Sequence, residues 1–553
     1  MKNLSGIFKR SIKRAENIAF LLAGAAFLFL FFTYRTPDLY NGLWEDEVHY
    51  SKPPLDKSGI SGLRNSSDTG RLMRPMLGGV LWKGIFSEKS GLFTPSERNL
   101  HALPLTISIL HLAMLFFLPW TESRSARFIT ALLVAFSGVE GRYATEAQSY
   151  SLVSLMGSAT FTGLAISLKA LEKGAVLRAM ATAGFTLFLS ANTHFFNLGI
   201  LAAAFAGWLA YALTVVGEAR QRRRVLTGFI FLSGLIAGAT YLINKPILDT
   251  MFLFASEMGP DKGGAYSPGN GLIYLTWNWE FLGLPGAFYC FVGALGLLHP
   301  LKRQRFLSAS LIAGVFVFKA FLCAYCVYKS VYSLSGRHLI MYLGPAALLF
   351  GLGVDCAVLW AGYVWRRISA SVPALNLELI AYNRLPIFIL CVTWLVSGHE
   401  AARASVEAVL TSAQRGLTLW RTMPANYSLT YHFLERVKKL NRPALVLTNH
   451  CWGHDIPELY LHSDLGSGPA GAEIQVLPAS LCGITLPEFT QKADRFMRVH
   501  RKEGLVVYFF EVTNNNSQGA CASKRPVIHH QKRDENSCVN IYSASEMPLP
   551  LPL

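Results

Sequence analysis

The chain has 553 residues, of which 52% are hydrophobic and only 15% are charged, and its mean hydropathy is positive. Soluble proteins carry charge on about 25% of their residues, so this composition excludes an ordinary soluble protein and predicts an integral membrane protein. The net charge of +17 does not indicate nucleic-acid binding. The basic residues form short clusters between apolar segments, where they determine membrane orientation.

The first apolar segment, 17–34, contains no Asp, Glu, Lys or Arg. It is preceded by a basic cluster made of Lys9, Arg10, Lys13 and Arg14. This order predicts a helix that leaves the cytoplasm, with the N-terminus inside. A cleaved signal peptide is the alternative, but no small-residue cleavage site follows, so we expect the helix to be retained.

Five further charge-free segments have the length of a membrane span: 99–121, 147–168, 225–244, 281–301 and 306–328. The uncharged segment 179–217 is long enough for two helices, and its polar centre around His194 predicts a helical hairpin. Three more expected crossings are short or contain an acid: 128–139, 338–365 and 385–399. The sequence therefore predicts about eleven transmembrane helices.

Lys and Arg alternate between the loops as they do in membrane proteins that retain positive charge in the cytoplasm. The loops expected inside carry Arg124, Arg127, Lys169, Lys173, Arg178, Arg220, Arg222, Arg223, Arg224, Lys302, Arg303, Arg305, Arg366, Arg367 and Arg384. The segments expected outside are 35–98, 140–146, 245–280, 329–337 and the chain after about 400. No internal repeat of the kind found in many transporters is visible.

Residues 401–553 are polar and follow a membrane domain of residues 1–400. Strand-like segments at 444–448 and 504–510 predict a small extramembrane α/β or α+β domain on the periplasmic side. Its tail after about 513 is rich in Asn, Ser, Lys and Pro, a composition typical of disorder. Four cysteines of this part are available for two disulfides in an oxidising compartment: Cys451, Cys482, Cys521 and Cys538.

Three adjacent acids, Glu45, Asp46 and Glu47, follow the first helix at the start of the long external loop 35–98. Acidic residues contribute little to membrane orientation, so topology does not explain the cluster. A carboxylate here is suited to act as a general base, and several are suited to hold a divalent cation. A solvated acidic turn is the alternative interpretation, and the acids alone do not decide between them.

The same loop contains cations interleaved with apolar residues: Lys52, Arg64, Arg71, Arg74 and Lys83. This pattern is typical of an interfacial helix whose cations meet lipid phosphates. Lipid anchoring and substrate binding remain equally open for any single arginine. Acids and cations in one loop meet the two needs of glycosyl transfer from a lipid phosphate, which are a base and a stabilised leaving group.

Four motifs occur in the order and spacing of a known enzyme class: 43–50 (LWEDEVHY), 96–109 (SERNLHALPLTISI), 145–152 (TEAQSYSL) and 336–345 (GRHLIMYLGP). Together they resemble the type C (GT-C) glycosyltransferases that use polyprenyl-phosphate sugars. This group includes protein mannosyltransferases, aminoarabinose lipid A transferases and rhizobial lipopolysaccharide glycosyltransferases. The resemblance covers about the first 360 residues and implies a GT-C-like helical fold; the C-terminal part resembles no family.

The resemblance implies roles for the residues at the matching positions. Asp46 would be the catalytic base, and Glu47 would support it or help to hold a divalent metal, whose presence stays open. Because Glu45 is also acidic, an alignment shifted by one residue would place Glu45 at the position of the catalytic base. His194 faces the same expected cavity side, although a helix-end histidine with a structural role is the alternative.

A second group would line the external cavity or bind the phosphate. Glu146 and Tyr150 belong to the third motif, in which Gln148 stands where the family has arginine. Either Arg142 would replace the missing cation, or the phosphate would rely on Arg71, Arg74 and Arg337; Lys52 is a further residue expected to bind the phosphate.

The implied reaction moves a sugar from a polyprenyl-phosphate donor to a hydroxyl of a lipid, glycan or protein acceptor. It would take place on the periplasmic face of a bacterial inner membrane, with inversion at the sugar carbon. A transporter or flippase of lipid-linked sugars is the main alternative, and it would place its acids within the membrane. Only Asp355 is expected there, which favours the enzyme over the transporter. A polymerase or ligase, whose long functional loop comes late in the chain, and a structural or sensory protein fit less well.

Overall fold

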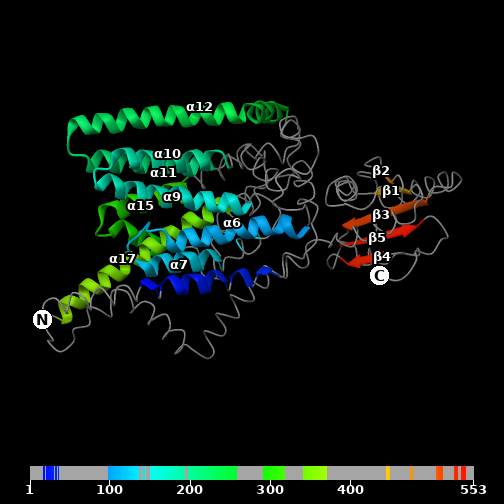
Figure 1. The fold of residues 1–553 in the computed structure, drawn as a ribbon, viewed down its shortest axis with the longest axis horizontal. Helices are drawn as coiled ribbons and strands as arrows, with labels where there is room; N and C mark the ends of the chain where they lie inside the picture. Colours follow the sequence, from blue (N-terminus) through cyan, green and yellow to red (C-terminus); the bar gives the residue numbers. More distant parts are fainter. Residues whose placement is uncertain are drawn as a thin grey trace.

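The computed structural model describes residues 17–36 with gaps at 19, 30 and 34, then 97–135, 140, 143–144, 150–193, 197–257, 291–317 and 340–369 (Figure 1). It also describes five strands between 444 and 543. The helical elements after the first helix are α6 (Glu97–Phe117), α7 (Arg124–Ala135), α9 (Tyr150–Glu172), α10 (Val176–Ala191), α11 (Asn197–Val215), α12 (Ala219–Glu257), the 3₁₀ turn η4 (Leu295–Leu298), α15 (Lys302–Ile312), the π-helical turn η5 (Ala313–Val317) and α17 (Leu343–Ser369). The long helices lie side by side as a bundle (Figure 1).

Three described helices are long and apolar enough to cross a membrane: Tyr150–Glu172, Ala219–Lys245 and Ile340–Val364. Helix α12 has none of its most apolar window buried, and large side chains such as Phe231 and Leu242 are more than 70% exposed. Apolar surface of this kind is stable in lipid and not in water. The fold is therefore that of a helical membrane protein.

The chain reverses direction between successive helices, so that its connections collect at two ends of the bundle. Residues 118–123, 173–175, 216–218 and 299–301 meet at one end, on the left of Figure 1. Most of the described lysines and arginines lie at or near this end, which is called the basic end below. Among them, Arg127 donates hydrogen bonds to the last carbonyls of α6, at Phe116 and Phe117. A cation at a helix C-terminus satisfies free carbonyls and the helix dipole.

The core lies where α6, α7, α9 and α17 meet, around side chains such as Trp120, Phe116 and Phe161 that are at most 1% exposed. Small residues allow α9 and α17 to approach closely. A Cβ atom on Gly157 would lie 2.4 Å from the backbone oxygen of Met341, in the 3₁₀ turn just before α17, so only glycine fits there. Close contact through small residues is a common way of packing membrane helices.

Two expected elements differ from the structure. The external loop predicted at 245–280 begins as helix, because α12 continues to Glu257. Lys245 ends the charge-free segment on which the sequence-based boundary is placed, but a lysine does not break a helix. In the predicted span 281–301, residues 291–294 are helical and end in the 3₁₀ turn η4, after which Leu301 is extended and precedes α15.

The expected hairpin in 179–217 is present as α10 and α11, which contact each other. The polar residues at its centre hold α12. Asn192 donates a hydrogen bond to Thr240 Oγ1 (3.1 Å), and Asn244 donates one to Asn192 Oδ1 (2.8 Å). Side-chain hydrogen bonds between helices stabilise membrane bundles because their groups have no water to bind.

The strands are β1 (Ala444–Thr448), β2 (Ile474–Leu477), β3 (Val506–Asn514), β4 (His529–Lys532) and β5 (Ser537–Ser543), in the order β2-β1-β3-β5-β4. Strands β2, β1 and β3 are parallel, whereas β3, β5 and β4 are antiparallel. Both strand segments expected from the sequence are therefore strands. That they belong to a periplasmic α/β or α+β domain remains a proposal.

Candidate functional site

The end of the bundle opposite the basic end is where the expected site residues join the described helices. Helix α6 begins there, α7 ends there, and α9 begins there at Tyr150. The expected residues fall in three segments that connect to this end: 37–96, 136–149 and 318–339. The helix order therefore supports the expectation that these segments share one face of the protein.

Most of the expected site residues lie outside the described residues. These are Asp46, Glu47, Lys52, Arg71, Arg74, Arg142, Glu146 and Arg337, together with His194. Tyr150 is described: it begins α9, is half-buried, and its ring centroid lies 4.8 Å from that of Tyr143. Tyr150 thus lies at the end of the bundle opposite the basic end, and its contact with substrate remains a proposal.

A buried carboxylate, Glu140, lies close to Tyr143 in the chain and was not anticipated as a site residue. Its side chain is 1% exposed and accepts a hydrogen bond from Ser154 Oγ at 3.0 Å. Its second oxygen lies 3.8 Å from His111 Nδ1, and the other nitrogen of that ring shares a hydrogen bond of 2.6 Å with Ser158 Oγ. A line of polar groups therefore runs from Glu140 into the bundle between α6 and α9.

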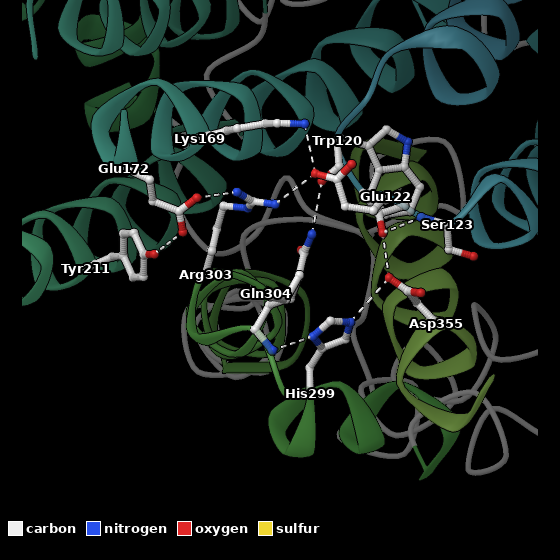
Figure 2. Close-up of polar contacts among 12 residues, drawn as sticks. Trp120, Glu122, Ser123, Lys169, Glu172, Tyr211, His299, Arg303, Gln304 and Asp355 are labelled. Atoms are coloured by element: carbon white, nitrogen blue, oxygen red, sulfur yellow. Dashed lines mark hydrogen bonds and ion pairs between the residues drawn. The ribbon is translucent and has the colours of Figure 1, made fainter. Parts of the chain in front are cut away.

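The basic end carries a separate set of polar contacts, shown in Figure 2. Arg303 is only 6% exposed and contacts both Glu172 (2.5 Å) and Glu122 (3.4 Å). Lys169 donates a hydrogen bond to Glu122 at 2.8 Å, and Tyr211 donates one to Glu172. These contacts join the 118–123 connection to α9, α11 and α15.

The charge on Glu122 is favoured by this network. The hydrogen bond from Lys169 is the largest influence and lowers the pKa of the Glu122 carboxyl below its ordinary value of 4.5. Partial burial acts in the opposite direction, whereas the positive charges of Lys169 and Arg303 add to the lowering. Glu122 is therefore ionised at neutral pH and serves as an acceptor at the basic end.

Asp355, the acid expected within the membrane, belongs to the same end. It accepts a hydrogen bond from Thr121 Oγ1 (2.5 Å), and its Oδ2 lies 3.2 Å from His299 Nε2 (Figure 2). Thr121 and His299 both lie in connections between helices. The aspartate thus holds two connections to α17, which is a structural arrangement and not an acid exposed along a transport path.

Among the described residues no group of three or more His, Cys, Asp or Glu side chains is arranged to hold a metal ion. The metal considered for Asp46 and Glu47 concerns residues outside this part of the chain.

Comparison with known proteins gives a match to solved structures alone, since neither a protein-family model nor a curated protein matches the chain. The fold is similar to that of the crystal structure of ArnT from Cupriavidus metallidurans bound to undecaprenyl phosphate. The match has a TM-score of 0.51 at 11% sequence identity and covers 97% of this chain and 99% of that one. The apo state of the same protein matches at 12% identity with a TM-score of 0.46, covering 96% and 100% of the two chains.

The fold is therefore a membrane fold like that of ArnT. At 11% identity the likeness concerns the fold alone, and it extends over nearly the whole chain. The chain thus has the architecture of ArnT without a close sequence relationship to it.

Proposed function

We propose that this protein is a membrane glycosyltransferase that uses a polyprenyl-phosphate-linked sugar. The observation that carries the proposal is the fold likeness across 97% of the chain to a protein crystallised with undecaprenyl phosphate. The ordered motifs support it independently, because they were identified from the sequence and join the bundle at one end. The donor is accordingly a sugar on a polyprenyl phosphate, and the acceptor is a hydroxyl of an envelope lipid, glycan or protein.

In this mechanism Asp46 removes the proton of the acceptor hydroxyl as its oxygen forms a bond to the sugar carbon. The bond from that carbon to the phosphate oxygen breaks, and the electron pair leaves with the polyprenyl phosphate. Attack opposite the leaving group inverts the anomeric carbon. Glu47 supports the base, or shares a divalent metal with Asp46 if one is required.

The phosphate leaving group needs positive charge around it. Lys52 and four arginines are proposed to supply it: Arg71, Arg74, Arg142 and Arg337. Glu146 and Tyr150 line the same cavity and contact the substrate. Cations aimed at a developing negative charge are most effective where lipid and protein exclude water.

Transfer is proposed to occur on the periplasmic face of a bacterial inner membrane. The basic end would then face the cytoplasm, because lysines and arginines are retained there during membrane insertion. The first helix supports the same orientation. Asn17 accepts a hydrogen bond from Arg124, so this helix starts at the basic end and leads toward the opposite one.

The test compares sugar transfer in membranes that contain the intact protein, Asp46→Asn or Glu47→Gln at equal expression. Removal of a general base lowers a rate by about 10²–10⁴-fold, and we expect Asp46→Asn to fall in this range and Glu47→Gln to be impaired. Asp38→Asn, a change of the same chemistry in the same loop, is the control and should retain transfer. Full activity in both Asp46→Asn and Glu47→Gln would contradict the assignment of the base.

A further inference from the structure

We propose that Glu140 is a positioning residue of the active site, although it does not touch substrate. Its buried carboxylate would hold the segment 136–149 against the bundle, and this segment contains the expected site residues Arg142 and Glu146. The inference rests on the proposed function and adds to it. Neither the motifs nor the comparisons assign a role to this residue.

The contacts of Glu140 reach two helices. Ser154 on α9 donates a hydrogen bond to Oε2 at 3.0 Å. His111 on α6 places Nδ1 at 3.8 Å from Oε1 and is itself held by Ser158 on α9 at 2.6 Å. Gly344 of α17 closes over this pair, since a Cβ atom there would lie 1.5 Å from Ser158 Oγ. The carboxylate is thus tied to the most closely packed part of the bundle.

Burial of a carboxylate at position 140 lowers the stability of the fold, so its presence there indicates a function. Glu140, His111, Ser154 and Ser158 are all fully buried as residues. A carboxyl group removed from water is unfavourable without polar partners, and an apolar side chain of similar size packs at lower cost. Glu140 is also the only acid between 123 and 145 in the sequence. A buried acid with dedicated partners shortly before a motif is expected to fix the start of that motif in place.

A backbone hydrogen bond ties Ala144 to the anchored residue. The N–H of Ala144 donates to the carbonyl oxygen of Glu140 at 2.7 Å. Tyr143 is 4% exposed and packs on Tyr150, the first residue of α9. The chain is therefore held at Glu140 and Tyr143, which precede the third motif, and at Tyr150 within it.

The basic end supplies a matched comparison. Asp355 is also a buried carboxylate that accepts a hydroxyl hydrogen bond, from Thr121, and lies beside a histidine, His299. It differs from Glu140 mainly in its place, at the far end from the expected site. A purely structural role for both acids predicts similar effects when each is neutralised, whereas a positioning role predicts different effects on turnover.

The experiment uses the full-length protein in detergent–lipid micelles and two variants, Glu140→Gln and Asp355→Asn. Glu140→Gln keeps the size of the side chain and an acceptor for Ser154 but removes the charge beside His111. The first measurement is hydrogen–deuterium exchange of the peptide that covers 136–149. The second is the kcat and KM for transfer from undecaprenyl-phosphate-linked sugar.

In Glu140→Gln we expect exchange in 136–149 to accelerate about tenfold, because the segment opens locally more often. The kcat should fall about tenfold or more, since small displacements of catalytic groups are costly. Asp355→Asn should leave exchange of this segment unchanged and kcat within about twofold of the intact protein. Glu140→Ala, which removes the anchor entirely, should exceed the effect of Glu140→Gln if it folds.

Unchanged exchange and kcat in Glu140→Gln would overturn the proposal, as would an equal loss of kcat in Asp355→Asn. If the intact protein transfers no sugar, the proposed function fails, and the positioning role fails with it. The exchange measurement does not depend on turnover, so it still decides whether Glu140 anchors the segment. The two failures are therefore distinguishable.

Discussion

Glu122 shows how one ionisable side chain contributes to the stability of the bundle. Its carboxylate accepts a hydrogen bond from Lys169 and contacts Arg303, so it joins a helix connection to α9 and α15. Its pKa is lowered in the folded protein from the ordinary 4.5. A carboxyl with a lowered pKa stabilises the folded state fully above its unfolded pKa and loses this effect as pH falls through the folded value.

We therefore expect Glu122→Gln to reduce the acid sensitivity of the folded protein. The intact protein and the variant should differ in melting temperature at pH 7, and the difference should shrink as pH falls below 4.5. The effect will be small, because the Glu122 side chain is 57% exposed and water screens the pair. Thermal unfolding in detergent between pH 7 and pH 3 is the measurement. A difference that grows toward low pH would contradict this account.

The sequence predicts the character of a single residue where its type and its immediate neighbours are enough, but it does not predict contacts between distant residues. Asp355 was recognised as an acid in an apolar segment, but its partner Thr121 is 234 positions away in the chain, and no pattern indicates that contact. Glu140 was missed for a similar reason. It borders a short apolar segment, and its partner His111 lies on another helix. A lone acid beside an apolar segment was the available signal.

At the scale of elements, the close contact of α9 with the turn that leads into α17 depends on glycine. A Cβ atom on Gly157 would lie 2.4 Å from the backbone oxygen of Met341, and backbone cannot move aside as a flexible side chain can. We expect Gly157→Ala to destabilise the protein by about 1–3 kcal/mol through overpacking.

Gly238→Ala is the matched control for this substitution. Gly238 is exposed on α12, and nothing lies within 4 Å of the position of its Cβ atom. The control should be neutral or slightly stabilising, because alanine favours helix more than glycine. Melting temperatures of both variants in the same detergent provide the comparison. Equal melting temperatures for Gly157→Ala and the intact protein would show that the helices have room to separate.

Apolar segments predict the positions of helices well where charged residues lie at both ends of the segment. Helices α6, α9 and α17 begin within about five residues of the expected spans. The length of helix α12 is underestimated from the sequence. Hydropathy marks the point where charged residues begin, and the helical backbone continues beyond that point. The 3₁₀ turn at Leu295–Leu298 was not predictable either, since the segment before it is as apolar as a complete span.

At the scale of the whole molecule, the alternation of basic loops predicted the order in which helices cross the bundle. The described connections place these basic residues at one end, and the segments with the expected acids and cations join the other. This separation suits an enzyme whose reaction takes place on one face. The positions within the reactive segments were beyond sequence reasoning, because long polar loops have no periodic pattern that fixes their conformation.

The separation also bears on the alternative, a transporter or flippase of lipid-linked sugars. Such a protein is expected to hold ionisable groups near the centre of the membrane on a path open to both sides. In the described part of the chain, the two buried acids within or beside spans, Glu140 and Asp355, lie toward opposite ends and are enclosed by protein groups. This arrangement favours the transferase.

The most direct test of the central claim uses purified protein in liposomes that contain a radiolabelled sugar on undecaprenyl phosphate and an envelope acceptor extract. The proposed function predicts that the label moves to an acceptor and that undecaprenyl phosphate is released in equal amount. Asp46→Asn should lower the rates of both by about 10²–10⁴-fold. Movement of the intact labelled donor from one leaflet to the other, with no release of undecaprenyl phosphate, would contradict the transferase and identify a flippase.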